Sequence, residues 1–262
     1  MFVYFKNGNK KAQESYYTVH NLDEAKRLST GKGVKIGIID WLFGDERAEM
    51  YSGFYDATEK GFINNKEHGY AMANTLKEVA PNCKVFALNG ITKESLNNDK
   101  LKVEFLEKSI QFAIKNNIRI LTYSHAAITD EKAVKKLKQI LKIAKNNNII
   151  TIFLHCDLKN NIMPVAIGSK VDYKRAKVFN IYQYDYNALN PIAYKKWMDS
   201  KKTDKGSFLS WSSMAPVLAG FIAMLIELNP LLTKQQVVEA LDKTATNDVP
   251  SILRAINYIS NS

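Results

Sequence analysis

The sequence has few cysteines and lacks any long hydrophobic run. Its 262 residues include two cysteines, Cys83 and Cys156, which do not support a disulfide framework. Each lies in an apolar, strand-like stretch, so we expect both to be packed and reduced, in a cytoplasmic setting. The longest apolar run, Phe221–Ile226, is far below the roughly 18 residues that cross a bilayer. The apolar stretch within Met1–Lys11 is too short for a secretory signal, so we expect neither export by that route nor a membrane span.

Acidic residues are also in short supply relative to basic ones. Lys and Arg total 37 and Asp and Glu total 26, which gives a formal net charge of +11 and invites a nucleic-acid or anionic-surface interpretation. Only five of the basic residues are arginine, the residue favoured for bidentate phosphate recognition. No aromatic stacking platform is evident among basic strands. We therefore do not expect nucleic-acid binding, and the charge at most favours acidic partners or substrates.

What the sequence does contain is the pattern of a large α/β domain. Hydrophobic residues at 46% and charged residues at 24% exclude intrinsic disorder and fibrous repeats. Several apolar runs lack polar alternation, as strands covered on both faces do. These expected strands are Val34–Ile39, Lys84–Leu88, Arg119–Tyr123, Ile149–Leu154 and Val165–Ile167.

Helical periodicity separates and follows these strands. In Asp130–Lys145, apolar residues recur at three- and four-residue spacing, and Asp130 is an expected N-cap. The other expected helices are Leu101–Lys115, Ser212–Leu228, Lys234–Thr244 and Ser251–Ile259. The alternation predicts a three-layer, doubly wound α/β fold, with a mostly parallel sheet flanked by helices. We expect one domain over residues 1–262, with 1–29 as an amino-terminal extension packed on it.

Three segments carry the chemistry of the chain. The first, Thr30–Asp40, is a glycine-containing turn and an apolar strand that ends in a carboxylate. The second begins at His68-Gly69-Tyr70 and continues to the strand after Ala80-Pro81. The third, Ser210–Gly220, reads Ser-Trp-Ser-Ser-Met-Ala-Pro and opens a long apolar helix. Together they resemble the subtilisin-like serine peptidases, and the resemblance runs from about Leu22 to Thr246.

The resemblance implies a catalytic triad of Asp40, His68 and Ser212. A serine hydroxyl is a weak nucleophile until an imidazole accepts its proton, and the imidazole needs a carboxylate to hold its tautomer and stabilise its charge. Alignment on Pro216 selects Ser212, whereas alignment on Ser-Met would select Ser213 and demand a deletion inside a helix. Taken singly, each triad residue also has a structural interpretation as a cap or a satisfied polar group.

The resemblance also assigns the surroundings of the triad. The Ser212 backbone N–H and the side chain of Asp157 fall at the oxyanion hole, where a carboxylate is a poor donor. Bulk has accumulated around the site, at Trp41, Leu42, Tyr70 and Trp211. Leu154, His155 and Cys156 stand where the family has alanines and glycine, and their larger side chains narrow or fill the pocket for the residue before the cleaved bond. The expected substrate-binding residues are Ser124, His125, Ala126, Leu154, His155 and Cys156.

Two functions follow from these residues. The first is a serine endopeptidase that cleaves a narrow, dedicated protein or peptide substrate; the alternative is a silent pseudopeptidase that binds a peptide or partner protein through the old cleft. We expect no cofactor and no metal: the stretch from His68 to Ala80 is too short for a calcium loop, and neighbouring His155 and Cys156 on one strand point to opposite faces. The sequence leaves the oligomeric state open.

Overall fold

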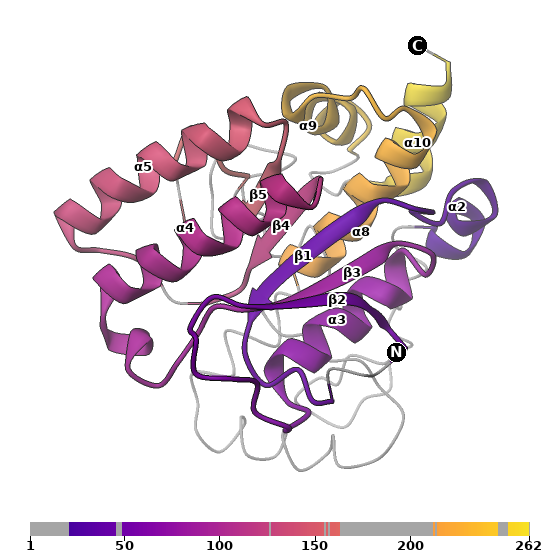
Figure 1. Cartoon of the computed structure of the whole chain (residues 1–262). Coiled ribbons are helices and arrows are strands. Elements are labelled where there is room, and N and C mark those ends of the chain that lie inside the picture. The colour runs from indigo at the N-terminus through magenta and orange to yellow at the C-terminus, as the bar shows by residue number, and fades with distance from the viewer. Residues whose placement is uncertain are drawn as a thin grey trace, which may run out of the picture.

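The computed structural model describes residues 21–45, 49–125, 127–154, 156, 158–162, 212, 214–245 and 251–261. Within these residues, five strands and several helices alternate along the chain (Figure 1). In order, the elements are α2 (Leu22–Leu28), β1 (Lys35–Asp40), β2 (Tyr51–Asp56), α3 (His68–Val79), β3 (Lys84–Asn89), the 3-10 turn η1 (Ser95–Asn97), α4 (Asp99–Lys115), β4 (Ile120–Tyr123), α5 (Glu131–Asn146), β5 (Ile150–Phe153), α8 (Met214–Leu228), α9 (Lys234–Lys243) and α10 (Ile252–Ser260).

The strands form one parallel sheet in the order β2-β3-β1-β4-β5. Strand β1 is central, with β3 on one side and β4 on the other. Its register pairs Asp40 with Asn89 of β3, and Ile39 with Tyr123 of β4. Because parallel strands end at the same edge, the residues that close β1, β3 and β4 meet there, where ligands of open α/β sheets bind.

Helices cover both faces of the sheet (Figure 1). Strand residues such as Ile36 and Ile38 face a core shared with α3 and α8, while Ile39 and Leu121 face a second core shared with α4 and α5. The alternation follows from the two-residue period of a strand. The prediction of a three-layer α/β fold with a mostly parallel sheet is confirmed.

Helix α8 is apolar on all sides because it lies inside the molecule. Every residue from Met214 to Ile226 is buried. It packs closely against α3, since a Cβ at Gly220 would overlap the Val79 side chain. This contact brings the middle of α8 close to the carboxyl end of α3 and fixes the packing of the two helices.

A carboxylate at the other end of α8 holds the turn that leads into β1. Glu227 Oε2 accepts hydrogen bonds from Ser29 Oγ (2.6 Å), Thr30 N (2.7 Å) and Lys32 N (2.9 Å). Burial by itself raises the pKa of Glu227, but these donors outweigh it and lower the pKa from its ordinary 4.5. The carboxylate therefore stabilises the fold above pH 4.5, and this contribution is lost as pH falls through the lowered value.

We expect Glu227→Ala to lower the free energy of unfolding by about 2 kcal/mol at pH 7, because three donors lose a charged acceptor. Urea titrations followed by circular dichroism measure this. Glu239→Ala is the matched control, since Glu239 pairs with exposed Lys243 and should change stability by less than about 0.5 kcal/mol. Equal losses in the two variants would contradict the role of Glu227.

Sequence periodicity locates the central elements but misses part of the periphery. Four expected strands match β1, β3, β4 and β5 to within a residue or so, and Asp130 caps α5 by accepting from Ala133 N. Strand β2 was not predicted, because its sequence YSGFYD has no apolar run and lies half-exposed at the sheet edge. Helix α2 was not predicted either. The expected strand Val165–Ile167 lies outside the described residues.

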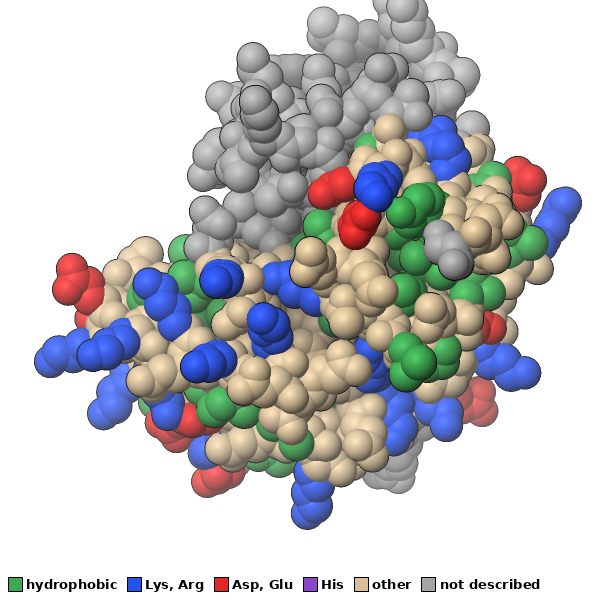
Figure 2. All heavy atoms as spheres, turned by 90° about the horizontal axis from the view of Figure 1, so that it is seen from above, with side chains coloured by type: hydrophobic (Ala, Val, Ile, Leu, Met, Phe, Trp, Pro, Cys, Tyr) green, Lys and Arg blue, Asp and Glu red, His purple; other side chains and the backbone are tan. Residues whose placement is uncertain are grey.

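Among the residues that the structure describes, the basic side chains lie largely on helices. Lysine side chains gather on the side of the molecule where α5 lies (Figure 2). Its six lysines are all exposed, opposite the buried stripe of Leu137, Ile140, Leu141 and Ala144. This is a solvated helix face, as its sequence predicts. Among the helices that the structure describes, none is long and apolar enough to traverse a membrane.

Candidate active site

Asp40 is the buried centre of the candidate site. It closes β1, and its side chain has no solvent exposure. The Trp41 backbone N–H donates to Asp40 Oδ1 at 2.8 Å, which orients the carboxylate at the carboxyl edge of the sheet. A fully buried carboxylate is costly unless charged or polar partners surround it, so its partners identify its role.

His68, the first residue of α3, is one of those partners. Its Nδ1 lies 2.9 Å from each carboxylate oxygen of Asp40. Gly69 permits this approach: its N–H donates to the Trp41 carbonyl at 2.9 Å, and a Cβ at this position would overlap that same oxygen. Glycine at this position therefore lets α3 start against the loop after β1, with His68 over Asp40.

The charges of this pair reinforce each other. Burial alone raises the pKa of Asp40, but attraction to and hydrogen bonds from His68 and His125 outweigh it and hold the pKa well below its usual range. Burial alone lowers the pKa of His68, but the Asp40 charge and its hydrogen bond raise it above the ordinary 6.5. An ionised carboxylate can only accept, so the His68 proton sits on Nδ1 and leaves Nε2 as an acceptor in the neutral ring.

His125 is a second imidazole on the same carboxylate. It follows β4 by two residues, and its Nε2 lies 3.2 Å from Asp40 Oδ1. The His68 and His125 ring centroids are 4.8 Å apart, and the Trp41 ring meets His125 edge-on at 6.4 Å. The sequence predicts His125 as a substrate-binding residue and does not predict its contact with Asp40. A histidine just beyond the strand next to β1 is the signal that could have indicated it.

Ser212 lies before α8, bound to the segment after β4. Ser124 Oγ donates to the Ser212 carbonyl at 2.9 Å, and Ser212 Oγ donates to the Ser124 carbonyl at 3.4 Å. Since Ile39 pairs with Tyr123, Ser124 follows β4 alongside the end of β1. Helix α8 begins at Met214, two residues later than predicted, and leaves Ser212 in a separate turn.

The other predicted site residues are placed less completely. Leu154 is 2% exposed and belongs to the hydrophobic core, while Cys156 is half-buried. The Asn161 side chain holds this segment, because its Nδ2 donates to the carbonyls of Phe153 (3.0 Å) and Cys156 (2.9 Å). The predictions for Ala126, His155, Asp157, Trp211 and Ser213 concern residues outside the described part of the chain.

A second carboxylate lies at the same edge of the sheet, and its partners among the described residues include no imidazole. Asp56 closes β2 and accepts hydrogen bonds from Thr58 Oγ1 (2.6 Å), Gly61 N (2.6 Å) and Asn89 Nδ2 (2.9 Å). These contacts stabilise the loop after β2. Asp56 is therefore a structural counterpart of Asp40, with the same position in its strand and different partners.

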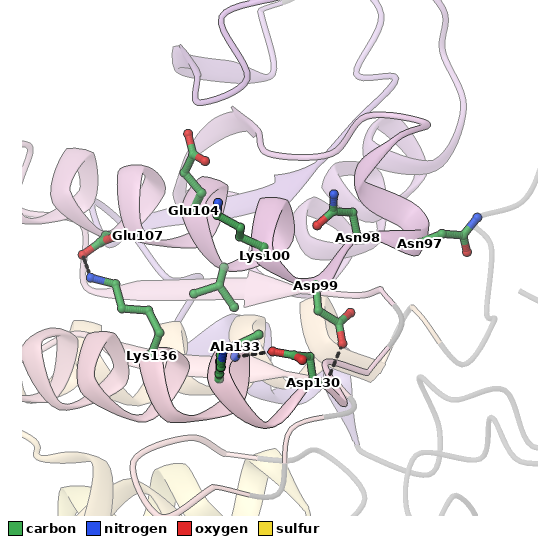
Figure 3. Close-up of a pocket in the computed structure, with 11 residues that line it drawn as sticks. Asn97, Asn98, Asp99, Lys100, Glu104, Glu107, Asp130, Ala133 and Lys136 are labelled. Atoms are coloured by element: carbon green, nitrogen blue, oxygen red, sulfur yellow. Dashed lines mark hydrogen bonds and ion pairs between the residues drawn. The ribbon is translucent and has the colours of Figure 1, made fainter.

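A separate hollow of about 860 Å³ lies between the first turns of α4 and α5 (Figure 3). Its lining combines buried Val103 and Ala133 with a Glu107–Lys136 ion pair of 2.6 Å. Asp99 beside it accepts from the backbone N–H groups of Thr129 (2.6 Å) and Asp130 (2.9 Å). These bonds attach the segment that follows His125 to α4.

The order of the strands, the two flanking layers and the polar cluster at the carboxyl edge define a subtilisin-like α/β fold. Solved structures that share it are subtilisin-like proteases. They include the prenylagaramide maturation protease PagA, at 18% identity and a TM-score of 0.59, with 93% of this chain and 99% of that chain covered. A lanthipeptide protease aligns at 14% identity and a TM-score of 0.61, covering 93% and 94%.

Fervidolysin from Fervidobacterium pennivorans, a keratinolytic enzyme related to subtilisin, aligns at 11% identity and a TM-score of 0.59. That alignment covers 92% of this chain and 45% of the larger one. No protein-family model matches the sequence, and no curated protein sequence is significantly similar to it. The chain thus has the fold of these proteases in a form whose sequence has diverged far from theirs.

Proposed function

We propose that the protein is a serine endopeptidase with Asp40, His68 and Ser212 as its triad. Ser212 Oγ attacks the carbonyl carbon of the peptide bond, His68 Nε2 takes the hydroxyl proton and later gives it to the leaving amine, and Asp40 stabilises the imidazolium that forms. The Ser212 backbone N–H serves as one oxyanion donor, and Asp157 in its protonated form is the candidate for the other.

The observation that carries this proposal is the buried Asp40 carboxylate bonded to His68 Nδ1 at 2.9 Å. If His68 acts as a general base, its Nε2 must stay free to accept a proton. A purely structural ion pair with Asp40 places no such requirement on Nε2. The raised pKa of His68 suits a group that must hold a proton midway through the reaction. In this structure Ser212 Oγ donates to the Ser124 carbonyl, and the proposal requires that it turn to donate to His68 Nε2 instead.

The substrate we propose is a dedicated protein or peptide, with a small side chain before the cleaved bond. Two proteins that share the fold are named for prenylagaramide maturation and for a lanthipeptide. Bulky Trp41 and half-buried Tyr70 flank Asp40 and His68, which leaves less room than small residues would. The exposed lysines favour a substrate with acidic residues. The reduced cysteines Cys83 and Cys156 support a cytoplasmic setting.

Labelling by a fluorophosphonate probe tests this proposal. The probe phosphonylates an activated serine, so we expect one label per chain, lost in Ser212→Ala. Ser213→Ala is the matched control because it removes the neighbouring hydroxyl and should label like the wild type. Absence of labelling across the whole pH range would overturn the proposal, and loss of the label in Ser213→Ala alone would move the nucleophile by one residue.

The labelling rate is expected to fall in acid, with a midpoint above pH 6.5. His68 accepts a proton only when neutral, and contact with Asp40 raises its pKa above 6.5, so the ring stays protonated to a higher pH than a free imidazole. Second-order labelling rates between pH 5 and 9 measure the midpoint. A midpoint below 6.5 would show that the group controlling the reaction is not His68 paired with Asp40.

A second candidate is a peptide-binding protein without hydrolysis. Two observations favour it: Ser212 Oγ donates to the Ser124 carbonyl, and a second imidazole occupies Asp40. A protein of this kind would bind its peptide equally well in the wild type and in Ser212→Ala. The fluorophosphonate probe would label neither. Fluorescence anisotropy with peptides derived from copurifying proteins, run beside the labelling assay, separates the two functions.

A further inference from the structure

His125 has no part in the triad mechanism, yet it completes a compact set of metal-ligating atoms. One ligand atom each from Asp40, His68 and His125 can be chosen so that all lie within 4.8 Å of one another. The nitrogen–oxygen separations to Asp40 are 2.9 Å for His68 and 3.2 Å for His125. Ligand atoms of a tetrahedral zinc ion, at about 2.0–2.1 Å from the metal, lie about 3.4 Å apart, which is close to the two separations from Asp40.

The donor set indicates which ion would bind. Two imidazole nitrogens and one carboxylate oxygen form the donor set of zinc sites that keep one position open, and imidazole favours Zn²⁺ over Mg²⁺ or Ca²⁺. The Trp41 N–H donates to Asp40 Oδ1 and holds the carboxylate in one orientation, as carboxylates that bind metal ions require. The side chains of His68 and His125 are 29% and 13% exposed, which gives the ion access from solvent, whereas Asp40 has none.

We propose that Asp40, His68 and His125 form an inhibitory Zn²⁺ site. Zinc coordinates Asp40 Oδ, His68 Nδ1 and His125 Nε2, with water as the fourth ligand. Each neutral ring releases the proton of its coordinating nitrogen to solvent and takes one from solvent on the other nitrogen, so no net proton is lost. The sequence predicts no metal, because the stretch after His68 is too short for a calcium loop and because His155 and Cys156 point to opposite faces of a strand. The present proposal departs from that prediction through a different set of ligands.

The tautomer change is what makes the site inhibitory. With zinc on Nδ1, His68 carries its proton on Nε2 and cannot accept the Ser212 proton, while Asp40 is occupied by the ion. This consequence rests on the proposed peptidase function, whereas metal binding itself does not. His125 is then the residue that distinguishes this site from a plain triad, since it supplies the third ligand.

Metal binding is tested on the full-length Ser212→Ala chain, which retains all three ligands. Titration with Zn²⁺ by calorimetry, and with Co²⁺ by visible absorption, should give one ion per chain and a four-coordinate cobalt spectrum without a thiolate band. His125→Gln, whose amide can still donate to Asp40, should weaken binding at least about 100-fold. Cys156→Ser and His20→Gln are the controls, since they remove a thiol and an imidazole that do not belong to the proposed ligand set, and they should bind as tightly as the parent. Unfolding midpoints check that all variants fold.

Retained affinity in His125→Gln, equal losses in the controls, or a thiolate-to-cobalt band would overturn the proposal. Inhibition is measured separately on the chain with Ser212 intact. At Zn²⁺ tenfold above its dissociation constant, the labelling rate should fall about tenfold and recover with EDTA. In His125→Gln, the ratio of rates with and without zinc should stay near one. If the chain binds zinc through His125 but is never labelled, the metal site stands and the proposed peptidase function is contradicted.

Discussion

Replacement of Ser212 by alanine is expected to lower kcat on a cleaved peptide by about 10⁶-fold, with KM little changed. The substitution removes only the hydroxyl group. Because a triad works as a unit, loss of the nucleophile removes most of the contribution that the triad makes to the rate. Ser212 precedes α8, whose burial and contact with α3 through Gly220 do not depend on that hydroxyl. We therefore expect the fold and peptide binding to survive. Single-turnover assays by mass spectrometry measure the loss.

The double variant Ser212→Ala/His68→Ala is the informative comparison. If the two residues act in one mechanism, the second substitution adds almost nothing to the first. A further large drop would show that His68 serves another step. An unchanged kcat in Ser212→Ala alone would contradict the assignment of the nucleophile directly.

The fold was predictable from the sequence wherever a strand is covered on both faces. Strands β1 and β3 to β5 are mostly apolar and do not alternate with polar residues, because helices pack on each side, and burial of this kind leaves a clear signal. Within the described residues, β2 (Tyr51–Asp56) pairs with β3 alone, and its sequence mixes aromatic with small and polar residues. Such an edge strand resembles a loop in sequence, and its pairing depends on β3, which periodicity alone does not reveal.

The candidate site was predictable in its residue types but not in its geometry. Asp40 and His68 could be assigned from motifs because each lies at a fixed end of an element, a strand end and a helix start. The direction of the His125 side chain could not be assigned from the sequence. His125 lies beyond β4, where neither strand alternation nor helix periodicity determines which way a side chain points. Its contact with Asp40 comes from the pairing of β1 with β4, a long-range feature.

Asp40→Asn is expected to lower kcat by about 10⁴-fold at neutral pH. Asparagine keeps the shape of the side chain, but its amide can donate to His68 Nδ1, which places the ring proton on Nε2 and leaves no acceptor for Ser212. The loss of the buried negative charge also removes the attraction that raises the pKa of His68. The midpoint of the acid limb should therefore move to lower pH in the residual activity. Kinetics between pH 5 and 9 measure both effects.

Asp56→Asn is the matched control for this variant. It makes the same substitution at the end of β2, where the described partners of the carboxylate are Thr58, Gly61 and Asn89 and none of them is an imidazole. Asp56 has no role in the proposed triad, so we expect kcat to change by less than about tenfold in Asp56→Asn. A larger loss would reflect disturbance of the sheet edge as a whole. If both variants lost activity equally, the effect of Asp40 would be structural. A large loss confined to Asp40→Asn, with a lowered acid limb, requires instead that Asp40 acts through the tautomer and charge of His68.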